Sequence, residues 1–210
     1  MEVKKPETES ILDFYNARYA LHGRHAKALD MSPESQRLRF QVLAKVGNLR
    51  NASLLDVGCG FGDYLDFLKQ ERIPVQYTGL DINASFVSEA SHRHPEAEFI
   101  LADIEDFPPG RRFDYVTVSG SFNVRFREDQ EEWVLGVIRS LFERADKALA
   151  INLISTYVDK GYERDDICYF SPEKIFALGR SLTPWVVLRH DYLPHDFTLF
   201  LYRGKHEDAR

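Results

Sequence analysis

The stretch Leu54–Leu68 reads LLDVGCGFGDYLDFL and decides the fold. A short apolar strand carries one acid, three glycines follow at alternate positions, and apolar residues then return at helical spacing. A buried strand, a glycine turn and a helix form the opening of a βαβ unit. Open parallel sheets bind ligands beyond the carboxyl ends of their strands, and glycines let backbone amides approach a ligand closely. We therefore expect a ligand site at residues 56–62.

The same alternation continues outward from this turn. Strands are expected at 53–57, 76–81, 97–102, 113–119 and 147–154, with helices at 62–70, 83–92, 128–144 and from 172. Nearly all-apolar strands in βαβ order predict an α/β fold, a Rossmann-like doubly wound and mostly parallel sheet covered on both faces. The apolar runs 185–189 and 197–202 flank DYLPHD, which predicts a hairpin and an antiparallel last strand.

Three segments are expected along the chain. Residues 1–50 form a helical extension, because 11–23 has apolar residues at helical spacing and Ser32-Pro33-Glu34 is typical of a helix start. Residues 51–204 form the single folded domain, and residues 205–210 form a polar tail.

Composition excludes several classes of protein. The 210 residues are 44% hydrophobic, which fits one sizeable core, and the net charge of −6 argues against a broad basic face for nucleic acid or anionic membrane. Two cysteines, Cys59 and Cys168, are too few for a disulfide framework and favour a reduced, cytoplasmic setting. No run reaches the roughly 18 apolar residues of a membrane span, and the first residues lack an apolar signal core. The sequence does not indicate an oligomeric state.

The ligand chemistry is indicated by acids at the strand ends. The order Gly58-Cys59-Gly60-Phe61-Gly62 departs from the GxGxxG of dinucleotide sites, which argues against a nicotinamide oxidoreductase. Acids on both sides of the turn disfavour a phosphate and favour a cationic amino acid ligand. Asp81, 19 residues after Gly62, is placed to accept ribose hydroxyls. Asp103 and Ile104 offer an acceptor and an apolar wall for adenine.

The motifs DVGCGFG, GLDIN, LADI and FDYVTVSGSFN, in this order and spacing, resemble those of the class I S-adenosylmethionine-dependent methyltransferases from about Leu54 to Tyr202. The resemblance implies a seven-stranded sheet with an antiparallel last strand and S-adenosylmethionine as cofactor. It implies that the turn from Asp56 to Gly62, with Gly58, Cys59 and Gly60, holds the methionyl part. Asp81 then holds the ribose, and Asp103 with Ile104 holds the adenine. Ile82 and Ser119 are further predicted cofactor contacts.

The helical extension is expected to cover the methionyl end of the cofactor. Tyr15, Tyr19 and Arg39 are candidates there, because an aromatic face favours a sulfonium cation and an arginine binds a carboxylate. The spacing of Tyr15 and Tyr19 is equally that of a plain core stripe. Candidates for a catalytic role are Asn123, His195 and Tyr15, although Asn123 also suits a strand end and His195 also suits a turn. The segment 155–170 looks like an insertion that roofs the site.

The acceptor is the least determined feature. SGSFN is neither the Asn/Asp-Pro-Pro-Tyr signature of amide and base-ring methylation nor the Pro-Cys of cytosine C5 methylation. A short acidic chain favours a small-molecule acceptor, with oxygen or nitrogen as nucleophile. An RNA or protein methyltransferase and a non-catalytic cofactor-binding scaffold remain alternatives. The pairs His22/His25 and His92/His94 lack further ligands at metal-site spacing, so no metal is expected.

Overall fold

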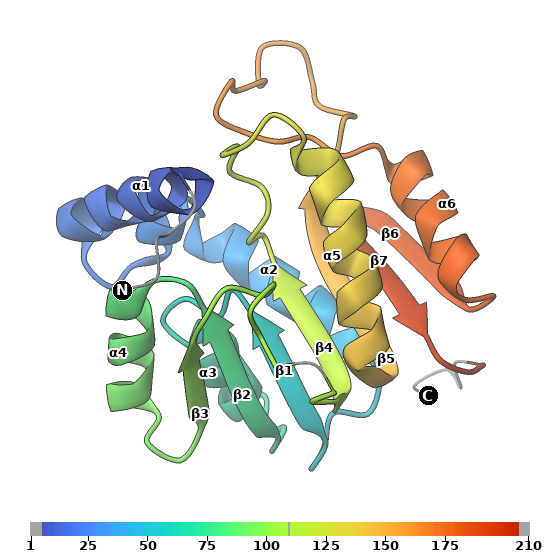
Figure 1. Ribbon diagram of the computed structural model, residues 1–210, viewed down its shortest axis with the longest axis horizontal. Coiled ribbons are helices and arrows are strands. Elements are labelled where there is room, and N and C mark those ends of the chain that lie inside the picture. The colour runs from blue at the N-terminus through green and yellow to red at the C-terminus, as the bar shows by residue number, and fades with distance from the viewer. Residues whose placement is uncertain (1–5, 109, 206–210) are drawn as a thin grey trace.

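A computed structural model describes residues 6–108 and 110–205, so most of the expected tail at 205–210 lies outside the described residues. Helices and strands alternate along the chain as the sequence predicts (Figure 1). The elements are α1 (Pro6–His22), η1 (Ala26–Leu29), α2 (Pro33–Leu43), η2 (Ala44–Val46), β1 (Ser53–Val57), α3 (Asp63–Gln70), β2 (Gln76–Asp81), α4 (Ala84–Arg93), β3 (Glu98–Leu101), β4 (Phe113–Ser119), α5 (Gln130–Arg144), β5 (Ala145–Ile154), α6 (Pro172–Leu182), β6 (Val186–Leu193) and β7 (Asp196–Tyr202).

The seven strands form one sheet in the order β3-β2-β1-β4-β5-β7-β6. All neighbouring pairs are parallel except those of β7, which is antiparallel to both β5 and β6. The predicted fold class is therefore confirmed, including the reversed last strand. β6 runs to Leu193, four residues beyond the expected end at 189, because Leu193 still pairs with Asp196 of β7 after a register shift that follows Arg189.

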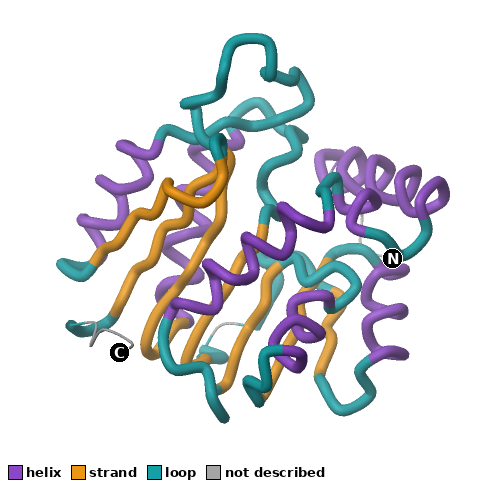
Figure 2. Tube along the Cα trace, turned by 180° about the vertical axis from the view of Figure 1, so that it is seen from behind, coloured by secondary structure: helices purple, strands orange, loops and turns teal. Residues whose placement is uncertain are grey.

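Two apolar layers cover the sheet. On one face β1, β4, β5 and β7 pack against α5 and α6, and on the other face the strands pack against α2 and α3. Figure 1 shows the first pair of helices in front of the sheet, and Figure 2 shows helices crossing it from behind. The strands are buried on both sides, which explains their nearly continuous apolar sequences.

Side-chain caps set the starts of three helices. Ser32 accepts a hydrogen bond from Ser35 N before α2, Ser171 accepts one from Lys174 N before α6, and Asn83 accepts from the first turn of α4. A proline occupies the first turn of both α2 and α6, where its missing N–H costs nothing. None of the helices in the described ranges combines the length and apolar character of a membrane crossing.

Candidate functional site

A cavity of about 390 Å³ lies where the carboxyl ends of β1, β2 and β4 meet the N-terminal helices. Its floor comes from strand ends and the turns that follow them, and its cover comes from α1 and η1. The lining residues from the strand side are Val57, Gly58, Gly60, Leu80, Asp81, Ile82, Asn83, Phe86, Ala102, Asp103, Ile104, Glu105, Ser119, Gly120, Ser121, Phe122, Phe126, Arg127 and Trp133. The cover contributes Thr8, Ile11, Tyr15, Leu29 and Met31.

The glycine turn can form only without side chains at two of its positions. Gly58 and Gly60 have φ values of 69° and 54°, in the left-handed region that other residues avoid. A Cβ at Gly58 would lie 2.0 Å from Ser121 Oγ, and one at Gly60 would lie 3.1 Å from Leu29 Cδ1. The turn therefore presents bare backbone to the cavity, which leaves a place for a ligand to approach closely.

Asp81 joins the glycine turn to the end of β2. Its Oδ2 accepts a hydrogen bond from Gly60 N at 2.9 Å, and its Oδ1 accepts one from Asn83 N at 2.8 Å. Burial raises the pKa of the Asp81 carboxyl, while these backbone donors act to lower it. A carboxylate can accept about four hydrogen bonds, so Asp81 can still accept hydrogen bonds from the hydroxyls of a ligand in the cavity.

The carboxyl ends of β2, β3 and β4 carry further residues that were predicted for the site. Ile82, Asp103 and Ile104 line the cavity, and Asp103 Oδ1 is held by Glu105 N at 3.0 Å. Ser119 also lines it, and its buried Oγ has no hydrogen-bond partner within the part of the chain that the structure describes. A buried hydroxyl without a partner at a cavity wall fits a polar ligand group at that position.

Asp56 lies in the core next to the turn and is not among the lining residues. Tyr77 donates a hydrogen bond to its Oδ2 at 2.5 Å, and Thr117 donates one to its Oδ1 at 3.2 Å. Only 2% of the residue is exposed, and burial raises the pKa of Asp56 to about 7. Its position supports the turn from the strand side.

Cys59 and Tyr19 also support the site without lining it. The Cys59 thiol is buried close to Gly79, and burial raises its pKa well above the usual value, so it is not a reactive thiolate. Tyr19 packs its ring against Phe61 and Phe86, with centroid distances of 5.3 and 5.7 Å. This placement is that of a core stripe, the alternative that its helical spacing left open.

Three polar residues that were predicted for the site lie outside the lining of the cavity. Arg39 Nη2 is paired with Asp196 Oδ1 at 2.8 Å, and Asn123 Oδ1 accepts a hydrogen bond from Ile154 N at 3.1 Å. His195 lies in the turn between β6 and β7, where its ring is tilted against that of Tyr162 with the two centroids 5.8 Å apart. None of the three lines the cavity.

One carboxylate, that of Asp30, connects the cover to the 155–170 segment. Asp30, which follows η1, pairs with Arg18 of α1 at 2.8 Å and with Arg164 of the 155–170 segment at 3.0 Å. Its chain neighbours Leu29 and Met31 both face the cavity. The 155–170 segment extends past the carboxyl ends of the strands (Figure 1), so these ion pairs connect the expected roof to the N-terminal cover.

Tyr15 is the lining residue contributed by the centre of α1. Burial and the charges of Asp81 and Asp30 raise the pKa of its phenol well above the usual value. The hydroxyl therefore stays protonated near neutral pH and is available as a hydrogen-bond donor at this wall.

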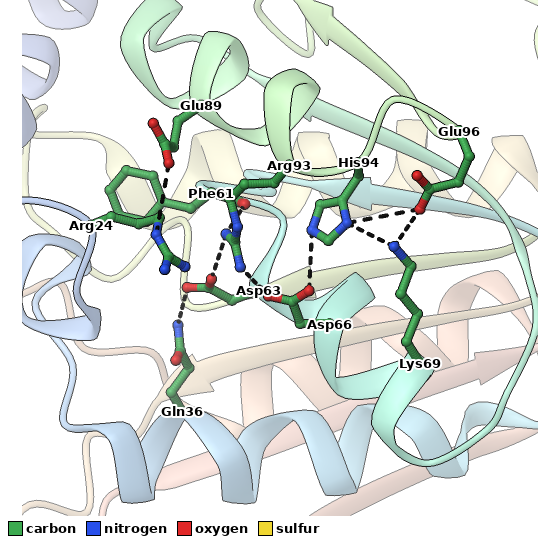
Figure 3. A network of polar contacts seen from close by, with 10 residues as sticks. All are labelled: Arg24, Gln36, Phe61, Asp63, Asp66, Lys69, Glu89, Arg93, His94 and Glu96. Carbon is green, nitrogen blue, oxygen red and sulfur yellow. Dashed lines mark hydrogen bonds and ion pairs between the residues drawn. The ribbon is translucent and has the colours of Figure 1, made fainter.

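Acids after the turn form a network that braces α3 against α4 (Figure 3). Arg93 pairs with Asp63 at 3.0 Å and with Asp66, and it donates a hydrogen bond to the Phe61 carbonyl. His94 Nε2 lies 3.3 Å from Asp66, and burial lowers the pKa of this histidine. Asp63 is one of the acids that flank the glycine turn, and Arg93 balances its charge. The described residues contain no group of three or more His, Cys, Asp or Glu side chains placed to hold a metal ion.

Several residues that line the cavity were not predicted from the sequence. Phe122 and Phe126 follow β4, and Trp133 lies in α5. The run SFNVRF could have indicated Phe122 and Phe126, because a turn rarely contains so many apolar residues. Leu29 and Met31 could not have been predicted, because the short stretch between the two helices has no periodicity to analyse.

Comparison with known proteins places this geometry in a family. A profile of the methyltransferase domain matches residues 54–143. A protein of Mycobacterium tuberculosis that is named as a methyltransferase is 33% identical over 159 residues, which is 72% of this chain and 93% of that protein. The fatty-acid O-methyltransferase of Mycolicibacterium smegmatis is 34% identical over 94 residues, which is 42% of this chain and 34% of that enzyme. The trans-aconitate 2-methyltransferase of Escherichia coli is 29% identical over 93 residues, or 44% of this chain and 37% of that enzyme.

Solved structures share the fold at low sequence identity. The magnesium protoporphyrin IX methyltransferase of Synechocystis PCC 6803, solved with bound S-adenosylhomocysteine (SAH), superimposes with a TM-score of 0.68 at 16% identity, over 94% of this chain and 96% of that one. The complex of DhpI with SAH gives the same TM-score at 18% identity, over 94% and 97% of the two chains. With the strand order, the glycine turn and the strand-end acids in place, these matches lead to one conclusion. The chain belongs to the class I methyltransferases, enzymes whose cofactor is S-adenosylmethionine.

Proposed function

We propose that this enzyme transfers the methyl group of S-adenosylmethionine to an oxygen or nitrogen atom of a small molecule. The cover over the cavity carries the proposal: Ile11, Tyr15, Leu29 and Met31 close the side of the site opposite the sheet. A covered site admits a small acceptor more readily than a folded RNA or protein. The names of two relatives, a fatty-acid and a trans-aconitate methyltransferase, also support a small-molecule acceptor.

The cofactor is proposed to lie across the carboxyl ends of four strands, β1 to β4. Asp81 would accept the ribose hydroxyls, and Asp103 with Ile104 would hold the adenine. The bare backbone at Gly58 and Gly60 would receive the methionyl part, with the Ser119 hydroxyl as a further partner. Each of these residues lines the cavity, and the unpartnered Ser119 Oγ supports a polar group beside it.

The chain's contribution to the reaction is proposed to be alignment and exclusion of water. The bound cofactor supplies an activated methyl group on a sulfonium, which needs an acceptor held in line. Tyr15 belongs to the cover and lines the cavity, where its ring can face a sulfonium cation and its protonated hydroxyl can orient an acceptor. Asn123 and His195 are not at the cavity wall, so neither is assigned a proton transfer.

Of the extension predicted at residues 1–50, the part that contains α1 and η1 is proposed to act as the cover of the site. α2 instead packs against the sheet, within the same core as the strands of the domain predicted at residues 51–204.

The two cysteines are free and buried. Free cysteines are usual in a reducing compartment, so we also propose a cytoplasmic location.

Calorimetric titration tests the proposal directly. The expected result is micromolar binding of both S-adenosylmethionine and SAH and no heat with NADH. Incubation with methyl-labelled cofactor and fractionated metabolite extract is then expected to label a compound small enough to pass an ultrafiltration membrane. Label retained with RNA or protein instead would contradict the small-molecule acceptor, and absence of SAH binding would contradict the assigned cavity.

A further inference from the structure

The walls of the cavity that the cofactor assignment leaves over are mostly apolar. They come from the cover, from the loop after β4 and from the start of α5. The apolar side chains among them are Ile11, Leu29, Met31, Phe122, Phe126 and Trp133. Met31 Sδ lies 3.9 Å from the place that a Cβ at Gly120 would take, and Leu29 Cδ1 lies 3.1 Å from the same point at Gly60. A molecule bound beside the methionyl end of the cofactor therefore meets an apolar surface.

Tyr15 offers a hydrogen-bond donor beside this surface. Its ring packs against Phe86 with the centroids 6.0 Å apart, and its hydroxyl makes no hydrogen bond within the described ranges. Because burial raises the pKa of the phenol well above its usual value, the hydroxyl keeps its proton and cannot serve as a base. It can donate one hydrogen bond to a lone pair of the acceptor.

The charged residues of the lining are already engaged. Glu105 accepts a hydrogen bond from Trp133 Nε1 at 2.9 Å, and Arg127 donates two to Asp129, at 2.6 and 3.0 Å. The other two acids of the lining are those assigned to the ribose and the adenine. None of the lining residues is thus placed as a general base at the methionyl end. This arrangement disfavours an acceptor that must lose a proton as it reacts, such as an alcohol or a protonated amine.

A carboxylate fits these conditions. It is ionised at neutral pH and reacts through an oxygen lone pair without losing a proton, and its second oxygen can accept the hydrogen bond of Tyr15. Its reaction with a sulfonium joins an anion to a cation and cancels both charges. Apolar walls favour such a step, because the exclusion of water strengthens the attraction between the two charges, while the neutral product loses little hydration.

We propose that the methyl acceptor is a carboxylic acid with an apolar body, and that Tyr15 donates a hydrogen bond to the carboxylate oxygen that does not take the methyl group. The inference rests on the proposed function and specifies its substrate class. In the reaction the bond between the methyl carbon and sulfur breaks, its electron pair stays on sulfur, and a carboxylate lone pair forms the new carbon–oxygen bond. The products are a methyl ester and SAH, and no proton is transferred. The apolar body packs against Leu29 and Met31.

The test determines which kind of bond holds the transferred methyl group. Enzyme is incubated with methyl-labelled S-adenosylmethionine and a metabolite extract, the small molecules are partitioned between heptane and neutral buffer, and each phase is treated with mild alkali. The label of an enzyme-free control is subtracted. A methyl ester of an apolar acid is expected to enter heptane and to release nearly all of its label as volatile methanol, whereas methyl ethers and methylamines keep theirs. Label that stays non-volatile would overturn the carboxylate acceptor, and label that stays in water would overturn the apolar body.

Tyr15→Phe keeps the ring and removes the hydroxyl. It is expected to bind SAH within about twofold of wild type and to form the ester about tenfold or more slowly at saturating S-adenosylmethionine, the loss that follows from one hydrogen bond to a charged group. Tyr19→Phe is the matched control, because Tyr19 lies on the same helix with its ring packed against Phe61, and its rate should equal that of wild type. An undiminished rate in Tyr15→Phe would overturn the role given to this hydroxyl.

Failure of the proposed function gives a different result. The wild type would then bind neither S-adenosylmethionine nor SAH, or the label would remain with RNA or protein. Alkali-stable label in a small molecule would leave that function intact and refute only the carboxylic acid acceptor.

Discussion

Replacing Asp56 by Asn is expected to stabilise the protein increasingly as the pH rises. Burial raises the pKa of this carboxyl from 3.8 to about 7 in the folded state. Between these values the folded protein holds a proton that the unfolded chain has released. The free energy of unfolding of the wild type therefore falls as the pH rises through this window.

The size of the effect follows from that shift. A pKa difference of about 3 units, at about 1.4 kcal/mol per unit, is a total of about 4 kcal/mol. At about pH 5 the wild type has lost roughly 1.5 kcal/mol of it, and at about pH 8.5 nearly all of it. Asn carries no charge, and the rotatable hydroxyls of Tyr77 and Thr117 can serve its amide oxygen and nitrogen. Asp56→Asn should thus gain about 3 kcal/mol relative to wild type between these two pH values.

Urea unfolding at both pH values, followed by circular dichroism, measures the change. Asp114→Asn is the control, because Lys147 lowers the pKa of Asp114 and keeps it ionised across this range. Its stability difference from wild type should therefore be the same at both pH values. A difference between Asp56→Asn and wild type that did not grow with pH would show that the carboxyl is ionised in the folded core, and the reasoning would fail.

Three further perturbations test the site. Asp81→Ala removes the acceptor for Gly60 N and for the ribose, so SAH affinity measured by calorimetry should fall by about 1–3 kcal/mol; an unchanged dissociation constant would remove Asp81 from the site. Gly60→Val must adopt a φ of 54° against Leu29, and the variant is expected to lose SAH binding while its far-ultraviolet spectrum stays that of a folded protein. Asp30→Asn weakens the ion pairs of this residue with Arg18 of α1 and with Arg164, so α1 should exchange amide hydrogens faster and SAH should dissociate faster. Identical exchange in wild type and Asp30→Asn would show that the cover is held by packing alone.

Sequence by itself determined the architecture and the part of the site that lies at the strand ends. The pattern LLDVGCGFG places a strand, a turn and a helix in order, and parallel strands must bring their carboxyl ends to one edge. For that reason Gly58, Gly60, Asp81 and Asp103 were predicted to meet, and all four line one cavity. Each of them owes its place to its own strand end, a feature local in the chain.

Only the tertiary structure decided the contacts between distant segments. The Asp56 side chain lies in the core and accepts a hydrogen bond from Tyr77, and Arg39 pairs with Asp196 near the other end of the chain. Met31 came to face the cavity from a loop without a pattern. The periodicity of the sequence predicts which face of a strand or helix is buried. It does not predict which polar groups on two elements will pair, because that depends on how the helices cross the sheet. The cover and its ion pairs are products of that packing, and no local stretch of residues encodes them.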